Sequence, residues 1–131
     1  MRDAKSTLCY RWFQEVWNEG REDSINSLMA NHAHIHGIIT EGQTGGSEGF
    51  KTFYRDFKNQ FSDVHVDFKD ALSQDDMECA LTNFTATHRE TGKKVSFSGL
   101  CLIRVEDGKI AEAWNHYDFL SVHQQLGRLL V

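Results

Sequence analysis

The sequence predicts one α+β domain in which three helices from the first half of the chain pack on one face of a curved antiparallel sheet. Apolar residues recur every three or four positions in the first half and every second position from Val64 onward. The pair Asp107-Gly108 lies between two apolar segments, which is the strongest short-range signal for a β-hairpin. Helices followed by a run of strands are typical of the α+β class.

The length and charge of the chain limit its partners. Its 131 residues suffice for one domain with a sizeable core, and we expect that domain to span residues 1–131. The formal net charge is -5, and the Lys and Arg residues are scattered, which argues against nucleic acid or an anionic membrane as partner. A small ligand or another protein fits better.

The three cysteines, Cys9, Cys79 and Cys101, are an odd number without CxxC spacing, and each lies in an apolar segment. They predict buried free thiols in a reducing compartment. No signal-peptide pattern and no apolar run of transmembrane length is present, so we expect a cytoplasmic protein.

Helices are predicted at three places. The first runs from Ala4 to Asn18, and a shorter second one from Asp23 or Ser24 to about Ala30. Ser47 is predicted to be the N-cap of the third, which carries an aromatic stripe of Phe50, Phe53, Tyr54, Phe57 and Phe61. Such a stripe is more often core than a ligand site.

Strands dominate the second half. A short strand is predicted within 32–39, before a glycine-rich loop. Four longer strands then form a meander, at residues 64–72, 77–88, 95–105 and from 110 onward. The final residues, 119–130, are predicted to form a short helix or a closing segment.

The last strand carries the candidate acid–base residues. Strict alternation puts on one face the residues Ile110, Glu112, Trp114, His116 and Asp118, and on the other Ala111, Ala113, Asn115 and Tyr117. Carboxyl and imidazole groups beside a large aromatic ring favour shifted pKa values suited to proton transfer. We expect Asp118 to be catalytic and His116 to orient it or donate to an oxyanion. The alternatives are a helix cap at Asp118 and a half-exposed strand histidine at His116.

Both faces of the sheet are predicted to be apolar. If the last two strands pair through the hairpin, one face shows Phe97, Cys101, Ile103, Val105, Ile110 and Trp114, and the other Leu100, Leu102, Ala111 and Ala113. Because helices cover one face only, we expect a homodimer through the other. A β-bulge would exchange the faces beyond it.

Three histidines, His32, His34 and His36, alternate and therefore share one face of the short strand. Histidines two apart can bind a metal, but the third lies too far along the strand to complete a tetrahedron easily. We therefore expect no metal, with His34 or His36 at the mouth of a pocket and His32 at the surface.

The stretches 13–20, 46–54, 91–95 and 107–127, in this order and at suitable spacings, resemble the SnoaL-like polyketide cyclases of the nuclear-transport-factor-2-like, ketosteroid-isomerase-like superfamily. The resemblance covers nearly the whole chain. It implies a cystatin-like α+β barrel, in which a conical, strongly curved sheet wraps around three helices, encloses a deep pocket and usually forms a dimer. It also implies aldol ring closure without metal or cofactor, with an acid–base aspartate at the position of Asp118.

The resemblance further places Trp17 and Phe53 among the pocket-lining positions, where known cyclases carry polar groups. We also expect Phe57 and Trp114 to bind the substrate, together with His34 and His36. The hairpin 87–92 is shorter than in the cyclases, which implies a smaller lid over the pocket.

These observations predict a cyclase or isomerase that transfers protons next to a carbonyl on a small hydrophobic, polyketide- or steroid-like substrate. The first alternative is a non-catalytic module of the same fold that binds small molecules or dimerises. A further alternative, epoxide hydrolysis, needs an Asp-Arg-Asp set that we cannot assemble from the sequence.

Overall fold

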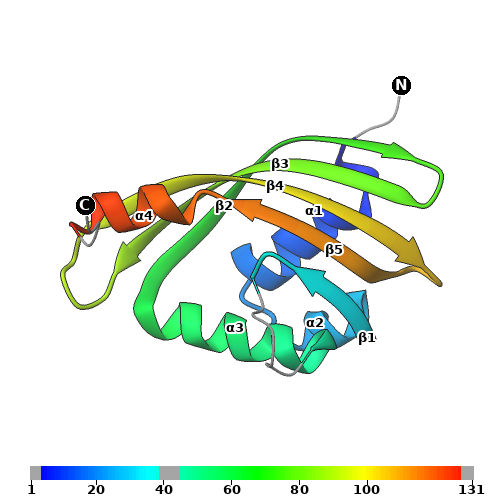
Figure 1. The fold of residues 1–131 in the computed structure, drawn as a ribbon, viewed down its shortest axis with the longest axis horizontal. Coiled ribbons are helices and arrows are strands. Elements are labelled where there is room, and N and C mark those ends of the chain that lie inside the picture. Colours follow the sequence, from blue (N-terminus) through cyan, green and yellow to red (C-terminus); the bar gives the residue numbers. More distant parts are fainter. Residues whose placement is uncertain (1–3, 39–44, 128–131) are drawn as a thin grey trace.

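The structure is a computed structural model that describes residues 4–38 and 45–127. Figure 1 shows an arched sheet with the helices α1, α2 and α3 on its concave side and α4 near one end. The helical elements are η1 (Ala4–Ser6), α1 (Leu8–Trp12), η2 (Phe13–Asn18), α2 (Asp23–Leu28), α3 (Gly46–Gln60) and α4 (Phe119–Gln125). The strands are β1 (Met29–His36), β2 (Phe61–Gln74), β3 (Met77–His88), β4 (Lys94–Glu106) and β5 (Lys109–Tyr117).

The sheet has the strand order β1-β5-β4-β3-β2. Strands β2 to β5 form the predicted antiparallel meander, and Asp107 and Gly108 both have positive φ, as a tight hairpin requires. β1 pairs with β5 in parallel, with His34 opposite Glu112 and His36 opposite Trp114. The α+β class is therefore confirmed, and the sheet is mixed rather than purely antiparallel.

The start of α3 differs from the prediction. Its N-cap is Gly45, and no side chain caps it. Ser47 is buried in the first turn, where its hydroxyl donates to Asn31 Oδ1 at 3.3 Å. Gly46 has a φ of 68°, and a Cβ there would overlap the Asn31 carbonyl oxygen. The prediction of Ser47 as N-cap is wrong. β1 lies close to the start of α3, and the Ser47 hydroxyl hydrogen-bonds the Asn31 side chain of β1 instead of capping the helix.

A β-bulge near the start of β5 changes which side chains face inward. Val105 pairs with Ile110, whereas the preceding residue Arg104 pairs with Glu112, so β5 contains one extra residue, Ala111. Such a residue reverses the alternation of side chains beyond it. The bulge therefore exchanges the predicted faces of β5 from Glu112 onward.

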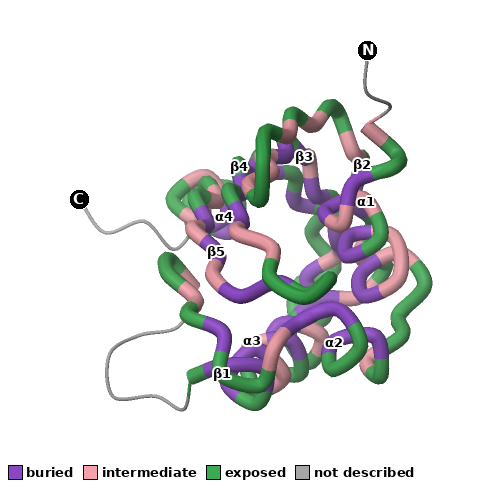
Figure 2. Tube along the Cα trace, turned by 90° about the vertical axis from the view of Figure 1, so that its right-hand side faces the viewer, coloured by how far each residue is buried: buried purple, intermediate pink, exposed green. Residues whose placement is uncertain are grey.

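Beyond the bulge, Ala113 and Asn115 are buried on the concave face. Glu112 and Trp114 are half-buried and His116 is exposed on the other face. The prediction that Glu112, Trp114 and His116 share a face with Ile110 is wrong. Figure 2 shows how buried and exposed positions alternate along the strands.

The predicted faces of β4 are confirmed. Phe97, Cys101 and Ile103 are buried, whereas Leu100 and Leu102 are 47% and 37% exposed. We define the outer face as the convex side of the sheet around Leu72, Cys79, Leu81, Leu100, Leu102 and Trp114. No helix among residues 4–38 and 45–127 is long and apolar enough to cross a membrane.

Candidate functional site

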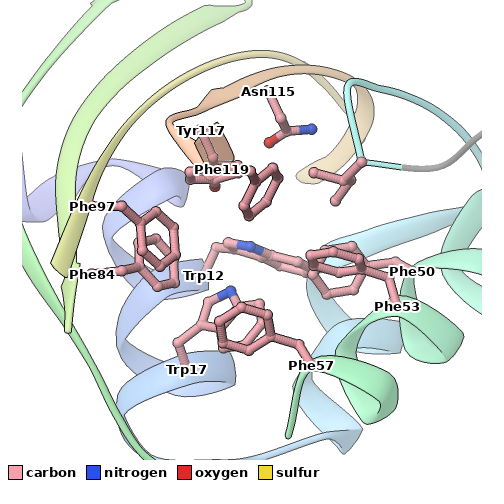
Figure 3. Close-up of a pocket in the computed structure, with 11 residues that line it drawn as sticks. Trp12, Trp17, Phe50, Phe53, Phe57, Phe84, Phe97, Asn115, Tyr117 and Phe119 are labelled. Carbon is pink, nitrogen blue, oxygen red and sulfur yellow. The ribbon is translucent and has the colours of Figure 1, made fainter. Parts of the chain in front are cut away.

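An aromatic pocket lies between the concave face of the sheet and the helical layer (Figure 3). Its cavity volume is ≈ 20 Å³, and it opens to solvent. The lining residues are Trp12, Trp17, Ile38, Phe50, Phe53, Phe57, Phe84, Phe97, Asn115, Tyr117 and Phe119. Nine of these eleven are aromatic, so the pocket favours a flat, apolar ligand.

The helical wall depends on the π-helical segment η2. The Glu19 N–H bonds the Gln14 carbonyl at 2.8 Å, five residues back. In a regular α-helix, positions five apart point in different directions, whereas a π-turn brings them toward one face. Trp12 and Trp17, which are five apart, can therefore both line the pocket. Trp12 packs edge-on against Phe50 with ring centroids 4.8 Å apart.

The sheet wall is built from three rings. Phe84 and Phe97 stack with centroids 5.1 Å apart, and Tyr117 packs edge-on against Phe84 at 5.4 Å. Gly99 lies opposite Tyr117 in the β4–β5 ladder, and a Cβ at Gly99 would overlap the tyrosine ring. Because Gly99 has no side chain, the Tyr117 ring can occupy the space beside it on β4.

Few of the described lining residues carry polar groups. Asn115 donates through Nδ2 to the His36 carbonyl at 3.0 Å. Within the described ranges, no residue accepts a hydrogen bond from the indole N–H of Trp12 or Trp17 or from the Tyr117 hydroxyl. No fully buried side-chain polar atom of this part of the chain lacks a partner, so the donor atoms of these three side chains keep some solvent exposure.

The pocket therefore offers hydrogen-bond donors. Burial raises the pKa of Tyr117 well above its ordinary value of 10.0, so its hydroxyl stays protonated and able to donate at neutral pH. Among the described residues that line the pocket there is no carboxylate and no imidazole. The arrangement can hold an acceptor such as a carbonyl oxygen.

Asp118 lies at the end of β5, between the lining residues Tyr117 and Phe119. It is exposed and is the N-cap of α4, where it accepts a hydrogen bond from the Ser121 N–H at 3.0 Å. The structure thus places it in the capping role that was the alternative to catalysis. A role in proton transfer stays a prediction.

The histidines expected at the pocket mouth lie elsewhere. His36 Nε2 is 2.8 Å from Glu112 Oε2, and the His36 ring stacks on Trp114 at 5.4 Å. This contact lowers the pKa of the Glu112 carboxyl. His34, His36 and His116 are exposed, and none of them lines the aromatic pocket. The expected placement was wrong because the bulge and the parallel pairing turn these side chains, with Trp114, to the convex side.

Trp17, Phe53 and Phe57 do line the pocket, although their role in binding stays a prediction. The other described lining residues, which we did not expect in the site from the sequence, are Trp12, Ile38, Phe50, Phe84, Phe97, Asn115, Tyr117 and Phe119. The alternation along the last strand did place Asn115 and Tyr117 together on one face. The sequence did not show which face points inward, because the bulge reverses the two faces.

In the described part of the chain, no three His, Cys, Asp or Glu side chains lie close enough together to hold a metal ion.

Solved structures share this fold. A proposed polyketide cyclase from Bacillus cereus ATCC 10987 is 30% identical, with a TM-score of 0.82 over 94% of this chain and 80% of that one. IdmH, a proposed polyketide cyclase from Streptomyces antibioticus, is 24% identical, with a TM-score of 0.82 over 95% and 99%. AclR, a proposed hydroxylase from Streptomyces galilaeus, is 21% identical, with a TM-score of 0.80 over 97% and 87%.

None of the curated proteins matches the sequence. The family model of the SnoaL-like polyketide cyclases matches residues 7–126. That range includes every strand of the sheet and all the described residues of the aromatic pocket. The chain therefore belongs to the SnoaL-like polyketide cyclase family.

Proposed function

We propose that the protein binds a small aromatic ketone in the aromatic pocket. The observation that supports this is the composition of the lining, which pairs many aromatic rings with donors that have no partner among the described residues. The rings favour a flat apolar body, and the indole and phenol groups favour an acceptor oxygen. A polyketide-like compound has both features.

The test is a titration with 2-acetylnaphthalene followed by two-dimensional ¹H–¹⁵N NMR. We expect the indole N–H signals of Trp12 and Trp17 to shift, because they would donate to the carbonyl or pack on the rings. The Trp114 signal, from the outer face, serves as internal control. The matched ligand is 2-isopropenylnaphthalene, in which a methylene replaces the oxygen, and we expect it to bind more weakly. Equal affinities, or shifts confined to Trp114, contradict the proposal.

A second candidate is proton transfer next to the carbonyl by Asp118. It is supported by the position of Asp118 between Tyr117 and Phe119, and by the family to which the chain belongs. Its test is the exchange of the acetyl methyl protons of 2-acetylnaphthalene in D₂O. Exchange that the protein accelerates and that Asp118→Asn abolishes would establish catalysis. Asn is a good N-cap, so this variant keeps α4 intact.

We also propose that a second copy of the chain covers the outer face. Leu72, Cys79, Leu102 and Trp114 are successive partners across four strands, and Leu81 and Leu100 pair beside them. Such a contiguous apolar surface is unusual on a monomer and suits a symmetric contact.

The cysteines support a second proposal, on the compartment. Cys9, Cys79 and Cys101 are free, which supports a reducing compartment such as the cytoplasm.

A further inference from the structure

The aromatic pocket must widen before its proposed ligand can enter. Its cavity volume of ≈ 20 Å³ is enough for about one water molecule. Sites that bind small organic molecules commonly measure about 300 to 1,000 Å³. The Phe119 ring packs against two other rings of the lining, with its centroid 5.7 Å from that of Phe97 and 5.8 Å from that of Tyr117. A flat ketone can therefore bind only after part of the lining has moved.

The mouth of the pocket consists of the lining residues that keep some exposure. The half-buried members of the described lining are Ile38, Phe53, Tyr117 and Phe119, and the others are buried. Figure 3 shows Phe119 on the same side of the pocket as Tyr117. One of these four residues must move aside to admit the ligand.

Three of the four belong to parts of the chain that are firmly held. Tyr117 lies in β5, which has a paired strand on each side. Phe53 lies in α3, in which six residues are buried. Ile38 follows β1, and the hydrogen bond from Asn115 to the His36 carbonyl fixes the end of that strand.

The fourth, Phe119, is the first residue of α4, which has few apolar anchors. The one buried residue of this helix is Val122, and Leu126 is buried just beyond its end. Displacement of α4 therefore exposes less apolar surface than displacement of α3 would.

Within the described ranges, hydrogen bonds join this segment to β4 at two points. Just before the helix, the Asp118 N–H donates to the Ser98 carbonyl at 3.0 Å. At the far end, the Gln125 amide accepts from the Ser96 N–H at 2.9 Å and donates to the Ser96 carbonyl at 2.7 Å. Gln125 is exposed, so water replaces its two hydrogen bonds at a small net cost when the pair separates. The chain can then turn at Asp118 while β5 stays in place.

We infer that α4 is a gate of the aromatic pocket, which turns about Asp118 and which Gln125 holds closed. When the gate opens, Phe119 leaves the pocket, and the ring system of the ligand takes its place against Phe97 and Tyr117. This inference rests on the proposed function for the chemistry of the ligand. It adds the route of entry and names Gln125, which does not line the pocket, as the residue that controls it.

The experiment measures the binding kinetics of 2-acetylnaphthalene by stopped-flow tryptophan fluorescence. Gln125→Leu weakens the closed form without altering a lining residue. Because the ligand binds only the open form, its apparent association rate follows the population of that form. We expect the association rate constant and the affinity to rise at least about fivefold, with the dissociation rate constant unchanged.

Thr7→Val is the matched control. It also removes two hydrogen bonds, those of the Thr7 hydroxyl with the Tyr10 N–H and the Ala4 carbonyl. Thr7 does not line the pocket and belongs to neither α4 nor β4. The Thr7→Val protein should bind at the unaltered rate. Equal association rates of the Gln125→Leu and unaltered proteins, or an equal rise in Thr7→Val, would overturn the inference.

Amide hydrogen exchange tests the gate in the unaltered protein, whether or not Gln125→Leu folds. Saturation with 2-acetylnaphthalene should accelerate exchange at Ser96, because the ligand-bound form has lost the hydrogen bond to Gln125. Exchange at Val66, which Asn18 bonds, should not accelerate. Slower or unchanged exchange at Ser96 in the complex would contradict the gate.

If the ketone binds neither the unaltered protein nor Gln125→Leu, the proposed function fails. The gate is then decided without a ligand, by acrylamide quenching in a Trp114→Phe protein, whose tryptophan fluorescence comes from Trp12 and Trp17. Adding Gln125→Leu should raise the quenching constant, and adding Thr7→Val should leave it unchanged. Equal quenching constants for all three proteins would overturn the gate.

Discussion

The Asp118 carboxylate closes the first turn of α4 through its hydrogen bond with the Ser121 N–H. Replacing Asp118 with Ala removes this cap and should lower the free energy of unfolding by about 1 kcal/mol. Asp118→Asn keeps a capping oxygen and should lower the free energy of unfolding by only a few tenths of that amount. Urea denaturation of both variants measures the difference. Equal losses would show that the charge, rather than the cap, stabilises this end of the chain.

The three thiols differ in accessibility. Cys9 and Cys101 are buried, and burial raises the pKa of both, whereas Cys79 is half-buried on the outer face. Since the thiolate is the reactive form, we expect Cys79 alone to react with Ellman's reagent in the native protein, slowly while a second copy covers the outer face, and all three thiols to react in denaturant. Cys79→Ala should abolish the native reaction, and a reaction that persists would contradict this placement.

At the scale of the element, α4 protects an exposed edge of the sheet. β5 ends at Tyr117, so on the side away from β3 the backbone of β4 has no neighbouring strand beside Ser96. The Gln125 amide takes that place, since its Oε1 accepts from the Ser96 N–H at 2.9 Å and its Nε2 donates to the Ser96 carbonyl at 2.7 Å. Asn18 bonds both backbone groups of Val66 on β2 in the same way.

Gln125→Leu removes both hydrogen bonds to Ser96 while keeping a side chain of similar size. We expect the free energy of unfolding to fall by about 1 to 3 kcal/mol. Amide hydrogen exchange at Ser96 should accelerate, whereas exchange at Val66, which Asn18 protects, should change only as far as global stability does. An unchanged rate of amide exchange at Ser96 in the Gln125→Leu protein would mean that Gln125 does not hydrogen-bond the Ser96 N–H in solution.

The elements show how far a sequence predicts such a fold. The hairpin at Asp107 was predictable because its turn needs a specific residue pair in a local conformation. The bulge at Ala111 was not, since the neighbouring Ile110 is also apolar and either could face inward. The parallel pairing of β1 with β5 joins segments far apart in the chain, for which local patterns carry no signal. These two features decided that Asn115, rather than His116, faces the pocket.

At the scale of the whole molecule, the proposed dimer depends on the outer face. Leu102→Glu places a charge at its centre and should convert a dimer into a monomer in sedimentation velocity experiments. Leu120→Glu is the matched control, because Leu120 is 58% exposed on α4, away from the outer face, and should leave the dimer intact. A monomeric unaltered protein would contradict the proposed dimer.

The buried acidic groups of the core predict loss of stability in alkali. Burial raises the pKa of Cys9, Cys101, Tyr54 and Tyr117 above their ordinary values. The unfolded chain therefore ionises first, so the stability that these groups contribute is present below the ordinary values and is lost as the pH rises through the folded ones.

We expect urea denaturation to give a lower free energy of unfolding at about pH 10.5 than at about pH 8. Tyr117→Phe, which keeps the ring, should lose less stability over this range. A Tyr117→Phe protein with the same pH dependence as the unaltered one would contradict a contribution from this residue.

The positions of the three tryptophans have an optical consequence. Trp12 and Trp17 line the aromatic pocket, and Trp114 lies on the outer face beside Leu102. The tryptophan fluorescence of the protein therefore comes only from these two places. A ligand that stacks in the pocket should quench the first pair, and a second copy that covers the sheet should shift the emission of the third toward the blue. Trp114→Phe would leave the pocket pair as a reporter of ligand binding, and the double variant Trp12→Phe/Trp17→Phe would leave Trp114 as a reporter of assembly.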